Sequence, residues 1–307
     1  MRRPKVCVLR TAGTNCDKET AAAFSLVGAA CELLHVNSLV SERRVLKDFH
    51  ILALPGGFSY GDDIASGRIF ANELRFKLAD SLREFIRDGK LIIGICNGFQ
   101  ILVKSGLLPG GSELKQTASL IINDSGKFEA RWVHLRTYNL KPRTQKCIWT
   151  RNLPETIYLP VAHGEGKFVA LDKTILNRLK KNKQIVFQYC DSRGKLTGYP
   201  DNPNGSTENI AGICDETGRV FGLMPHPERH VLAAQHPRWT GELTSRSRTF
   251  EKVRDSIRAD DLRHLHSVSH ALIEEGDGLW LCQEDSKPLP PGLQIFKNGV
   301  KYVRENL

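Results

Sequence analysis

Short apolar runs alternate with stretches of helical spacing along the first hundred residues. The apolar runs predict strands over residues 5–9, 31–36, 50–54 and 91–95. Between them, apolar positions three or four residues apart predict helices over residues 17–27, 41–49 and 68–88. This alternation predicts an α/β fold with an open, mostly parallel sheet, helices on both faces, and a site at the carboxyl ends of the strands.

The pattern changes in the second half of the chain. Residues 117–169 contain short alternating runs, and we expect them to form a β-rich cover across the site. The remaining predicted elements are a strand over residues 184–189, a hairpin over residues 210–223 that leads into His226, and a last helix over residues 293–303.

A segment of different charge, residues 236–290, separates the hairpin from the last helix. It holds eight Lys or Arg and ten Asp or Glu, a net charge of −2, whereas the whole chain carries +10. Its apolar spacing suggests two amphipathic helices. We therefore predict a main domain over residues 1–235, a helical or partly disordered insertion over 236–290, and a helix in 291–307 that returns to the main domain.

Cys96 carries the clearest chemical signal. It follows a buried strand and lies in the sequence Gly94-Ile95-Cys96-Asn97-Gly98, before a short amphipathic stretch that predicts a helix. A sharp strand-to-helix turn exposes its central residue and needs small flanking residues. The start of a helix also favours a thiolate. Cys96 is therefore a candidate nucleophile, although a buried structural cysteine would fit this motif taken alone.

A nucleophilic cysteine needs a base and a group that orients the base. The sequence Met224-Pro225-His226-Pro227-Glu228 offers His226 and Glu228 for these two roles, and the flanking prolines restrict the loop. A surface histidine in a proline-rich turn is the ordinary alternative. The base and its orienting carboxylate nevertheless complete a candidate triad with Cys96.

Gly56 and Gly57 supply a third element of the candidate site. They follow the strand over residues 50–54, and without side chains their backbone N–H groups can approach a reacting carbonyl. The N–H of Asn97 can share the same oxyanion. A plain turn between strand and helix is the alternative.

Taken together, the three motifs Pro-Gly-Gly, Gly-x-Cys-x-Gly and His-Pro-Glu resemble those of the class I glutamine amidotransferases. Six motifs in chain order resemble, more specifically, the glutaminase subunits of phosphoribosylformylglycinamidine synthase. These motifs lie at residues 11–17, 55–63, 94–100, 162–166, 202–206 and 224–229. The resemblance runs from about Lys5 to Arg229 and resumes near Gly292, so residues 236–290 depart from what the family usually contains.

The resemblance implies a flavodoxin-like glutaminase in which Cys96, His226 and Glu228 hydrolyse glutamine. It implies that ammonia passes to a large ATP-dependent synthetase subunit, with a small accessory subunit, which converts formylglycinamide ribonucleotide to formylglycinamidine ribonucleotide in purine biosynthesis. ATP and Mg would bind the partner, because this chain has no phosphate-binding loop motif and we expect no cofactor in it. Gln100 is a weaker candidate for substrate contact.

Some alternatives stay open at this level. The loop over residues 162–166 could form a wall of the glutamine pocket, a partner contact or a structural turn. A hydrolase or hydratase of the related single-domain superfamily is a rival, although those proteins usually place His directly after the nucleophile, where this chain has Asn97. A non-catalytic regulatory module is a second rival.

Composition excludes several other classes. The basic residues behind the pI of 9.2 are scattered, so no nucleic-acid partner is expected. The eight cysteines lack paired spacing, which argues against a disulfide scaffold and a metal site. His264, His266 and His270 have no carboxylate or Cys pattern joining them, and we favour a solvated face. Without a signal peptide or a membrane-spanning run, we expect a cytoplasmic protein.

Overall fold

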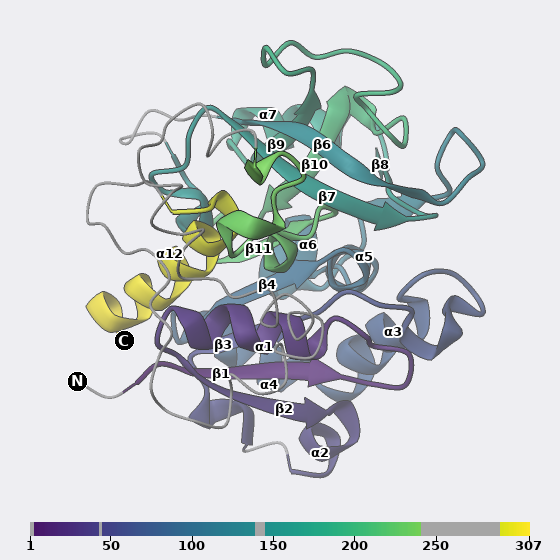
Figure 1. The fold of residues 1–307 in the computed structure, drawn as a ribbon. Helices are drawn as coiled ribbons and strands as arrows, with labels where there is room; N and C mark the ends of the chain where they lie inside the picture. The colour runs from purple at the N-terminus through teal and green to yellow at the C-terminus, as the bar shows by residue number, and fades with distance from the viewer. Residues whose placement is uncertain (1–2, 43–44, 139–144, 241–288) are drawn as a thin grey trace, which may run out of the picture. The chain divides into compact units, whose positions relative to one another are not determined.

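A nine-stranded sheet organises the computed structural model, which describes residues 3–42, 45–138, 145–240 and 289–307 (Figure 1). The strand order is β2-β1-β3-β4-β11-β10-β9-β6-β7. The strands are β1 (Lys5–Arg10), β2 (Ala30–His35), β3 (Ile51–Leu54), β4 (Leu91–Ile95), β6 (Glu129–Thr137), β7 (Thr156–His163), β9 (Ile185–Cys190), β10 (Ile210–Cys214) and β11 (Val220–Leu223). Neighbours are parallel from β2 to β11 and antiparallel from β11 to β7, which confirms the predicted α/β class.

Helices cover both faces of the parallel half. The helices of the described residues are α1 (Asp17–Leu26), α2 (Val36–Ser41), α3 (Arg68–Lys77), α4 (Ala79–Arg87), α5 (Asn97–Lys104), α6 (Leu107–Gly110), α7 (Lys173–Lys181) and α12 (Pro291–Asn306), of which α7 packs on β8 instead. In Figure 1, α1 and α12 lie on the near face and α4 lies behind the sheet. Because both faces are covered, every residue of β3 and β4 is buried, as expected for central parallel strands.

Two predicted helices are wrong in extent. The helix expected over residues 68–88 is divided into α3 and α4 at Leu78, whose φ of −120° and ψ of 9° leave the helical region. The helix expected over residues 41–49 is replaced by α2, which ends at Ser41, and a short 3₁₀ turn over Val45–Asp48. His35 starts α2 earlier than predicted, because its ring Nδ1 accepts a hydrogen bond from the N–H of Asn37.

The predicted β-rich cover is smaller than expected. Only β5 (Ala118–Ile121) and β8 (Lys167–Ala170) form a separate two-stranded sheet. The strands β6 and β7 pair beside β9 and extend the main sheet instead. Their burial alternates along each strand, because one face packs on the core and the other is half-exposed.

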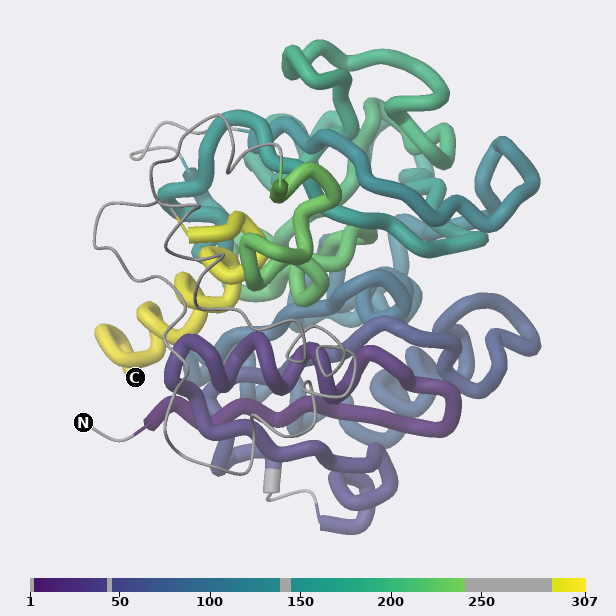
Figure 2. The backbone as a smooth tube through the Cα atoms, in the orientation of Figure 1, coloured from purple at the N-terminus to yellow at the C-terminus, as the bar shows by residue number. Residues whose placement is uncertain are grey.

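The last helix, α12, packs against the start of the chain. The ring of Phe296 meets Phe24 of α1 edge to face, with ring centroids 4.8 Å apart, and the Asn298 side chain donates hydrogen bonds to the carbonyls of Trp149 and Arg151. Figure 2 shows the yellow end of the tube beside its purple beginning.

Contacts divide the chain into one unit of Met1–Val231 with Pro290–Leu307 and another of Leu232–Leu289. The predicted insertion falls almost wholly on residues 241–288, which lie outside the described residues, and so do His264, His266 and His270. Within the described ranges, no helix is both long and apolar enough to cross a membrane.

Candidate active site

Cys96 lies at the sharp turn between β4 and α5. Its φ of 51° and ψ of −106° are far from helical or extended values. The flanking glycines explain how the chain makes this turn: a Cβ on Gly98 would lie 1.9 Å from the carbonyl oxygen of Leu54, and one on Gly94 would lie 2.6 Å from that of Gly98. The predicted elbow is therefore present, and strain is confined to Cys96.

The strand β11 places His226 and Glu228 beside this elbow, because β11 runs parallel to β4 and ends at the same edge. The ring Nδ1 of His226 and Oε1 of Glu228 are 2.6 Å apart, and both side chains are at most 2% exposed. Burial alone would lower the pKa of His226. The carboxylate of Glu228 and the thiols of Cys96 and Cys16 outweigh burial and hold this pKa well above its ordinary value.

The other ring nitrogen of His226 is not engaged. Its Nε2 is buried and has no hydrogen-bond partner among the described residues. The thiol of Cys96 donates a hydrogen bond to the carbonyl oxygen of Ala162, 3.5 Å away, rather than to His226. The three predicted residues are thus brought together, but Cys96 Sγ and His226 Nε2 do not meet the geometry of a hydrogen bond.

The glycines of the predicted oxyanion loop approach the same place. Gly57 has φ of +139° and pairs with Thr14 across an isolated bridge. Ser59, two residues after Gly57, is tied to the elbow, because its backbone N–H and its hydroxyl both donate hydrogen bonds to Oδ1 of Asn97. The loop that carries Gly57 and the first residue after the nucleophile are therefore held together through side-chain contacts.

Gln100 is engaged inside the protein. Its Oε1 accepts a hydrogen bond from Asn97 Nδ2 at 2.9 Å, and its Nε2 donates to the carbonyl of Glu165 at 2.5 Å. The side chain is only 3% exposed. Its predicted contact with substrate stays a prediction, and the observed contacts link α5 to the loop over residues 162–166.

The same loop is anchored by a buried ion pair. Lys104 of α5, whose side chain is 4% exposed, lies 3.2 Å from a carboxylate oxygen of Glu165 and donates to the carbonyl of Ser66 at 2.6 Å. Burial lowers the pKa of Lys104, and the Glu165 carboxylate opposes this shift. Since Ala162 contacts Cys96, the loop over residues 162–166 lies beside Cys96 and is fastened to α5. Its role as a wall of the glutamine pocket or as a partner contact stays a prediction.

Cys16 lies in the motif over residues 11–17, but the predicted triad does not include it. It directly precedes α1 and is 1% exposed. A Cβ built on Gly56 would lie 3.1 Å from its sulfur, 2.9 Å from His226 Cε1 and 3.4 Å from Cys96 Cβ, so these side chains surround one point. Burial raises the pKa of Cys16 to about 11. Its position at the end of the first predicted strand-to-helix turn, on the same sheet edge as Cys96, was the available signal.

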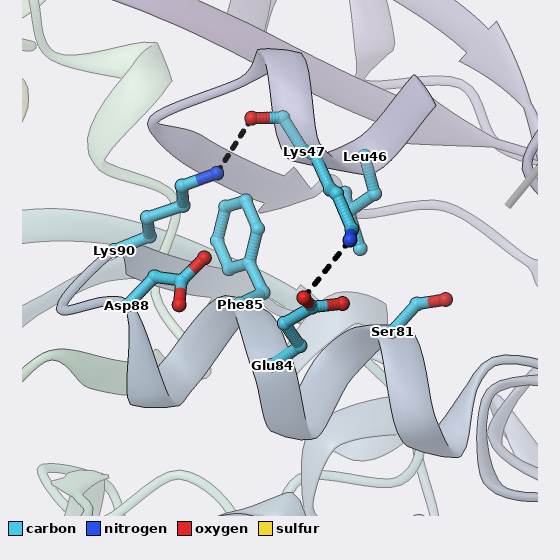
Figure 3. Close-up of a pocket in the computed structure, with 7 residues that line it drawn as sticks. All are labelled: Leu46, Lys47, Ser81, Glu84, Phe85, Asp88 and Lys90. Atoms are coloured by element: carbon cyan, nitrogen blue, oxygen red, sulfur yellow. Dashed lines mark hydrogen bonds and ion pairs between the residues drawn. The ribbon is translucent and has the colours of Figure 1, made fainter. Parts of the chain in front are cut away.

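A small hollow elsewhere has no part in this chemistry. It lies beside α4 and is lined by Leu46, Lys47, Ser81, Glu84, Phe85, Asp88 and Lys90 (Figure 3). Lys47 pairs with Glu84 at 2.9 Å across it. Lys90 directly precedes β4, so the hollow lies at the amino edge of the sheet, opposite to Cys96.

An α/β sheet with an elbow cysteine beside a buried His–carboxylate pair is the arrangement of enzymes that use a thiolate nucleophile. Residues 3–303 match the family of the CobB/CobQ-like glutamine amidotransferase domain. The phosphoribosylformylglycinamidine synthase subunit PurQ of Dehalococcoides mccartyi is 42% identical over 306 residues, covering 99% of this chain and all of the relative. The corresponding subunit of Methanococcus maripaludis is 47% identical, with 98% of each chain covered.

A solved structure, that of PurLQS from Thermotoga maritima, contains a chain 34% identical to this one, with a TM-score of 0.60 over 78% of this chain and 94% of that one. The chain belongs to the glutamine amidotransferase family and, within it, to that of the phosphoribosylformylglycinamidine synthase subunit PurQ. The resemblance drawn from the six motifs is confirmed.

The comparisons also bear on residues 236–290, which we expect to depart from what the family usually contains. The relative from Dehalococcoides mccartyi aligns over 306 residues and therefore spans this segment. The relative from Archaeoglobus fulgidus matches over 252 residues, which cover 77% of this chain and 91% of the relative. Longer and shorter forms thus both occur.

Proposed function

We propose that this chain hydrolyses the side-chain amide of glutamine to glutamate and ammonia, with Cys96 as nucleophile, His226 as base and Glu228 as the carboxylate that orients His226. The observation that carries the proposal is the buried pair of His226 and Glu228, 2.6 Å apart, beside a cysteine at a strained elbow. A pair of this kind fixes the tautomer of the histidine and stabilises the imidazolium that forms during the reaction.

The reaction follows from these positions. His226 Nε2 takes the thiol proton, and Cys96 Sγ attacks the amide carbon of glutamine. Backbone N–H groups near Gly57 and of Asn97 stabilise the oxyanion. The imidazolium then gives its proton to the leaving nitrogen, ammonia departs, and water releases glutamate from the thioester.

Ammonia must reach its acceptor without becoming ammonium, so a partner has to receive it directly. The relatives from Dehalococcoides mccartyi and Methanococcus maripaludis are named as subunits of a synthase, and the solved relative is part of PurLQS. We propose that the partner is a large ATP-dependent synthetase, assisted by a small subunit, which makes formylglycinamidine ribonucleotide for purine biosynthesis in the cytoplasm. ATP and Mg would bind that partner, and this chain would need no cofactor.

The positions of Cys96 and His226 are consistent with a glutaminase activity that depends on the partner. The thiol of Cys96 is hydrogen-bonded to Ala162 instead of His226, and Gly57 can change its backbone angles at little cost. We propose that the isolated chain is a slow glutaminase and that docking of the synthetase during its turnover adjusts the loop over residues 55–60. An uncoupled enzyme would waste glutamine.

The test compares two nitrogen sources in the reconstituted complex. Cys96→Ala should abolish glutamine-dependent synthesis while free ammonia still supports it, because only ammonia production needs the thiolate. His226→Ala should behave alike, and Glu228→Gln should lose less, since removing the orienting group of a triad can cost less than removing the nucleophile. Glutamine-dependent turnover by Cys96→Ala would refute the assignment. Full glutaminase activity of the wild-type chain alone would refute the coupling.

A further inference from the structure

Three groups with affinity for soft metals surround the point next to Gly56. They are the thiol of Cys16, the ring of His226 and the thiol-bearing carbon of Cys96, which lie 3.1, 2.9 and 3.4 Å from the position of an added Cβ. The hydrolysis proposed above uses only one of the two thiols. The second thiol, Cys16, has no role in it, although it is buried beside the catalytic histidine.

The polar atoms around this point are incompletely paired. His226 Nε2 and Glu228 Oε2 are buried and have no hydrogen-bond partner among the described residues. Ligand atoms of Cys16, His226 and Glu228 all lie within 4.8 Å of one another. Buried polar atoms are nearly always paired, so two unpaired atoms beside a thiol indicate a place that a ligand can fill.

We infer that this pocket binds a soft divalent cation of the Zn²⁺ class through Cys16 Sγ, His226 Nε2 and, after rotation of its side chain, Cys96 Sγ. Glu228 already occupies the other ring nitrogen, as carboxylates do behind the histidine ligands of zinc. Zinc binds sulfur at about 2.3 Å and imidazole nitrogen at about 2.0–2.1 Å, so the thiols of Cys16 and Cys96 need to move toward His226 Nε2 when the ion binds.

The charges permit such an ion. Arg229 donates to Cys16 Sγ at 3.3 Å, but its guanidinium is paired with Glu19 at 3.0 Å. A zinc ion displaces the thiol protons when it binds, and two thiolates balance its charge. The ion would occupy both the lone pair of the base and the nucleophile. It is therefore a reversible inhibitor of glutamine hydrolysis, and not a cofactor.

The experiment measures binding directly on the full-length chain, after treatment with a chelator. Zn²⁺ is titrated in competition with a chromophoric zinc indicator, and Co²⁺ is used to detect thiolate ligation by its absorption in the near ultraviolet. We expect one tight site per chain. Affinity should fall about tenfold or more in Cys16→Ser and in Cys96→Ser, and stay unchanged in Cys31→Ala, which removes a half-buried thiol on β2.

A second measurement needs no variant. Zn²⁺ should protect Cys16 and Cys96 of the wild-type chain together from alkylation, as read by mass spectrometry. Wild-type affinity in a folded Cys16→Ser variant, or protection of Cys96 alone, would overturn the inference. The inference relies on the proposed function only for the role of the pocket. Zinc binding without glutaminase activity would therefore refute the proposed function and leave the zinc site standing. Glutaminase activity without zinc binding would refute the zinc site alone.

Discussion

At the turn between β4 and α5, Gly94 and Gly98 have no side chains, and this lets the backbone make the sharp turn at Cys96. An alanine at position 98 would place its Cβ 1.9 Å from the Leu54 carbonyl oxygen, a backbone atom that cannot move without shifting β3. Overpacking of this kind costs about 1–3 kcal/mol or more. We predict that Gly98→Ala lowers the free energy of unfolding by at least that amount in urea titrations.

The matched control for that variant is Gly198→Ala. An added Cβ at Gly198 meets nothing within 4 Å, and its backbone is not in the left-handed region. Its free energy of unfolding should stay within about 0.5 kcal/mol of wild type. Equal effects of the two alanines would show that crowding at the elbow is relieved by local movement.

His226 should make stability depend on pH. Its native pKa is raised above the ordinary value near 6.5, because Glu228 and the two thiols outweigh burial. At pH values between the ordinary pKa and the native pKa of His226, the native state binds more protons than the unfolded state. The stabilisation is therefore fully present below about pH 6.5 and is lost as pH rises through the native pKa.

The measurement is urea unfolding at about pH 6 and about pH 9, on either side of the histidine's ordinary pKa. The free energy of unfolding of the wild type should fall from the lower to the higher pH. It should fall less in His226→Gln, whose side chain cannot be protonated. Titrating groups that do not contact His226 behave alike in both proteins and cancel in the comparison. An equal fall in both would mean that protonated His226 is not favoured in the native state.

The residues that sequence reasoning located are those that sit in short motifs. Cys96, His226 and Glu228 lie within two such motifs, and the parallel pairing of β4 with β11 brings both to one edge. Cys16 lies in the motif over residues 11–17, but its closeness to His226 depends on how the first loop meets Gly56, forty residues later in the chain, and the motif alone does not give that contact.

At the scale of elements, the sequence predicted the order of helices and strands along the chain better than the residues at which they begin and end. The break at Leu78 has no proline or glycine to announce it, and Leu78 itself is 2% exposed, so packing rather than local preference sets it. The alternating pattern of β6 and β7 correctly predicted strands with one buried face. That pattern cannot say which sheet a strand joins, because pairing partners are far away in sequence.

Lys104 and Glu165 join two elements of the site, and we predict that they position it. Lys104→Met leaves the buried side of Glu165 and the Ser66 carbonyl without their donor. The loop that contacts Cys96 should then loosen, and kcat for glutamine hydrolysis in the complex should fall about tenfold or more with a smaller change in KM. Lys77→Met removes a pair with Glu73 in which the lysine is half-exposed and is the control, with little effect expected.

A double variant separates positioning from simple loss of stability. Adding Glu165→Gln to Lys104→Met removes the unpaired buried charge and should restore part of kcat, because the amide can still accept from the Ser66 N–H. Unchanged activity in Lys104→Met, with its ion pair removed, would show that the loop is held by other contacts.

At the scale of the whole molecule, the C-terminal helix α12 packs against the segment that follows His226. Gly292, at the start of α12, packs so closely on the segment after His226 that an added Cβ would lie 2.1 Å from the Pro227 carbonyl and 2.4 Å from that of His230. Within the unit of Met1–Val231 and Pro290–Leu307, the segment around His230 and the start of α12 are therefore neighbours. The sequence could predict this return from the apolar spacing of residues 293–303, whereas the structure of the segment itself had no motif to indicate it.

We predict that replacing residues 236–290 by a short Gly/Ser linker leaves a folded chain that still labels at Cys96 with a glutamine-analogue electrophile. The linker has little distance to span, and loop-closure cost grows only logarithmically with length. A relative that matches only 77% of this chain along 91% of its own length is consistent with this expectation. Labelling is followed by mass spectrometry beside circular dichroism, with Cys96→Ala as the unlabelled control. A folded variant that no longer labels would show that the segment helps to build the active site, because the packing of α12 on Phe24 and Trp149 would then be intact while the pocket is not.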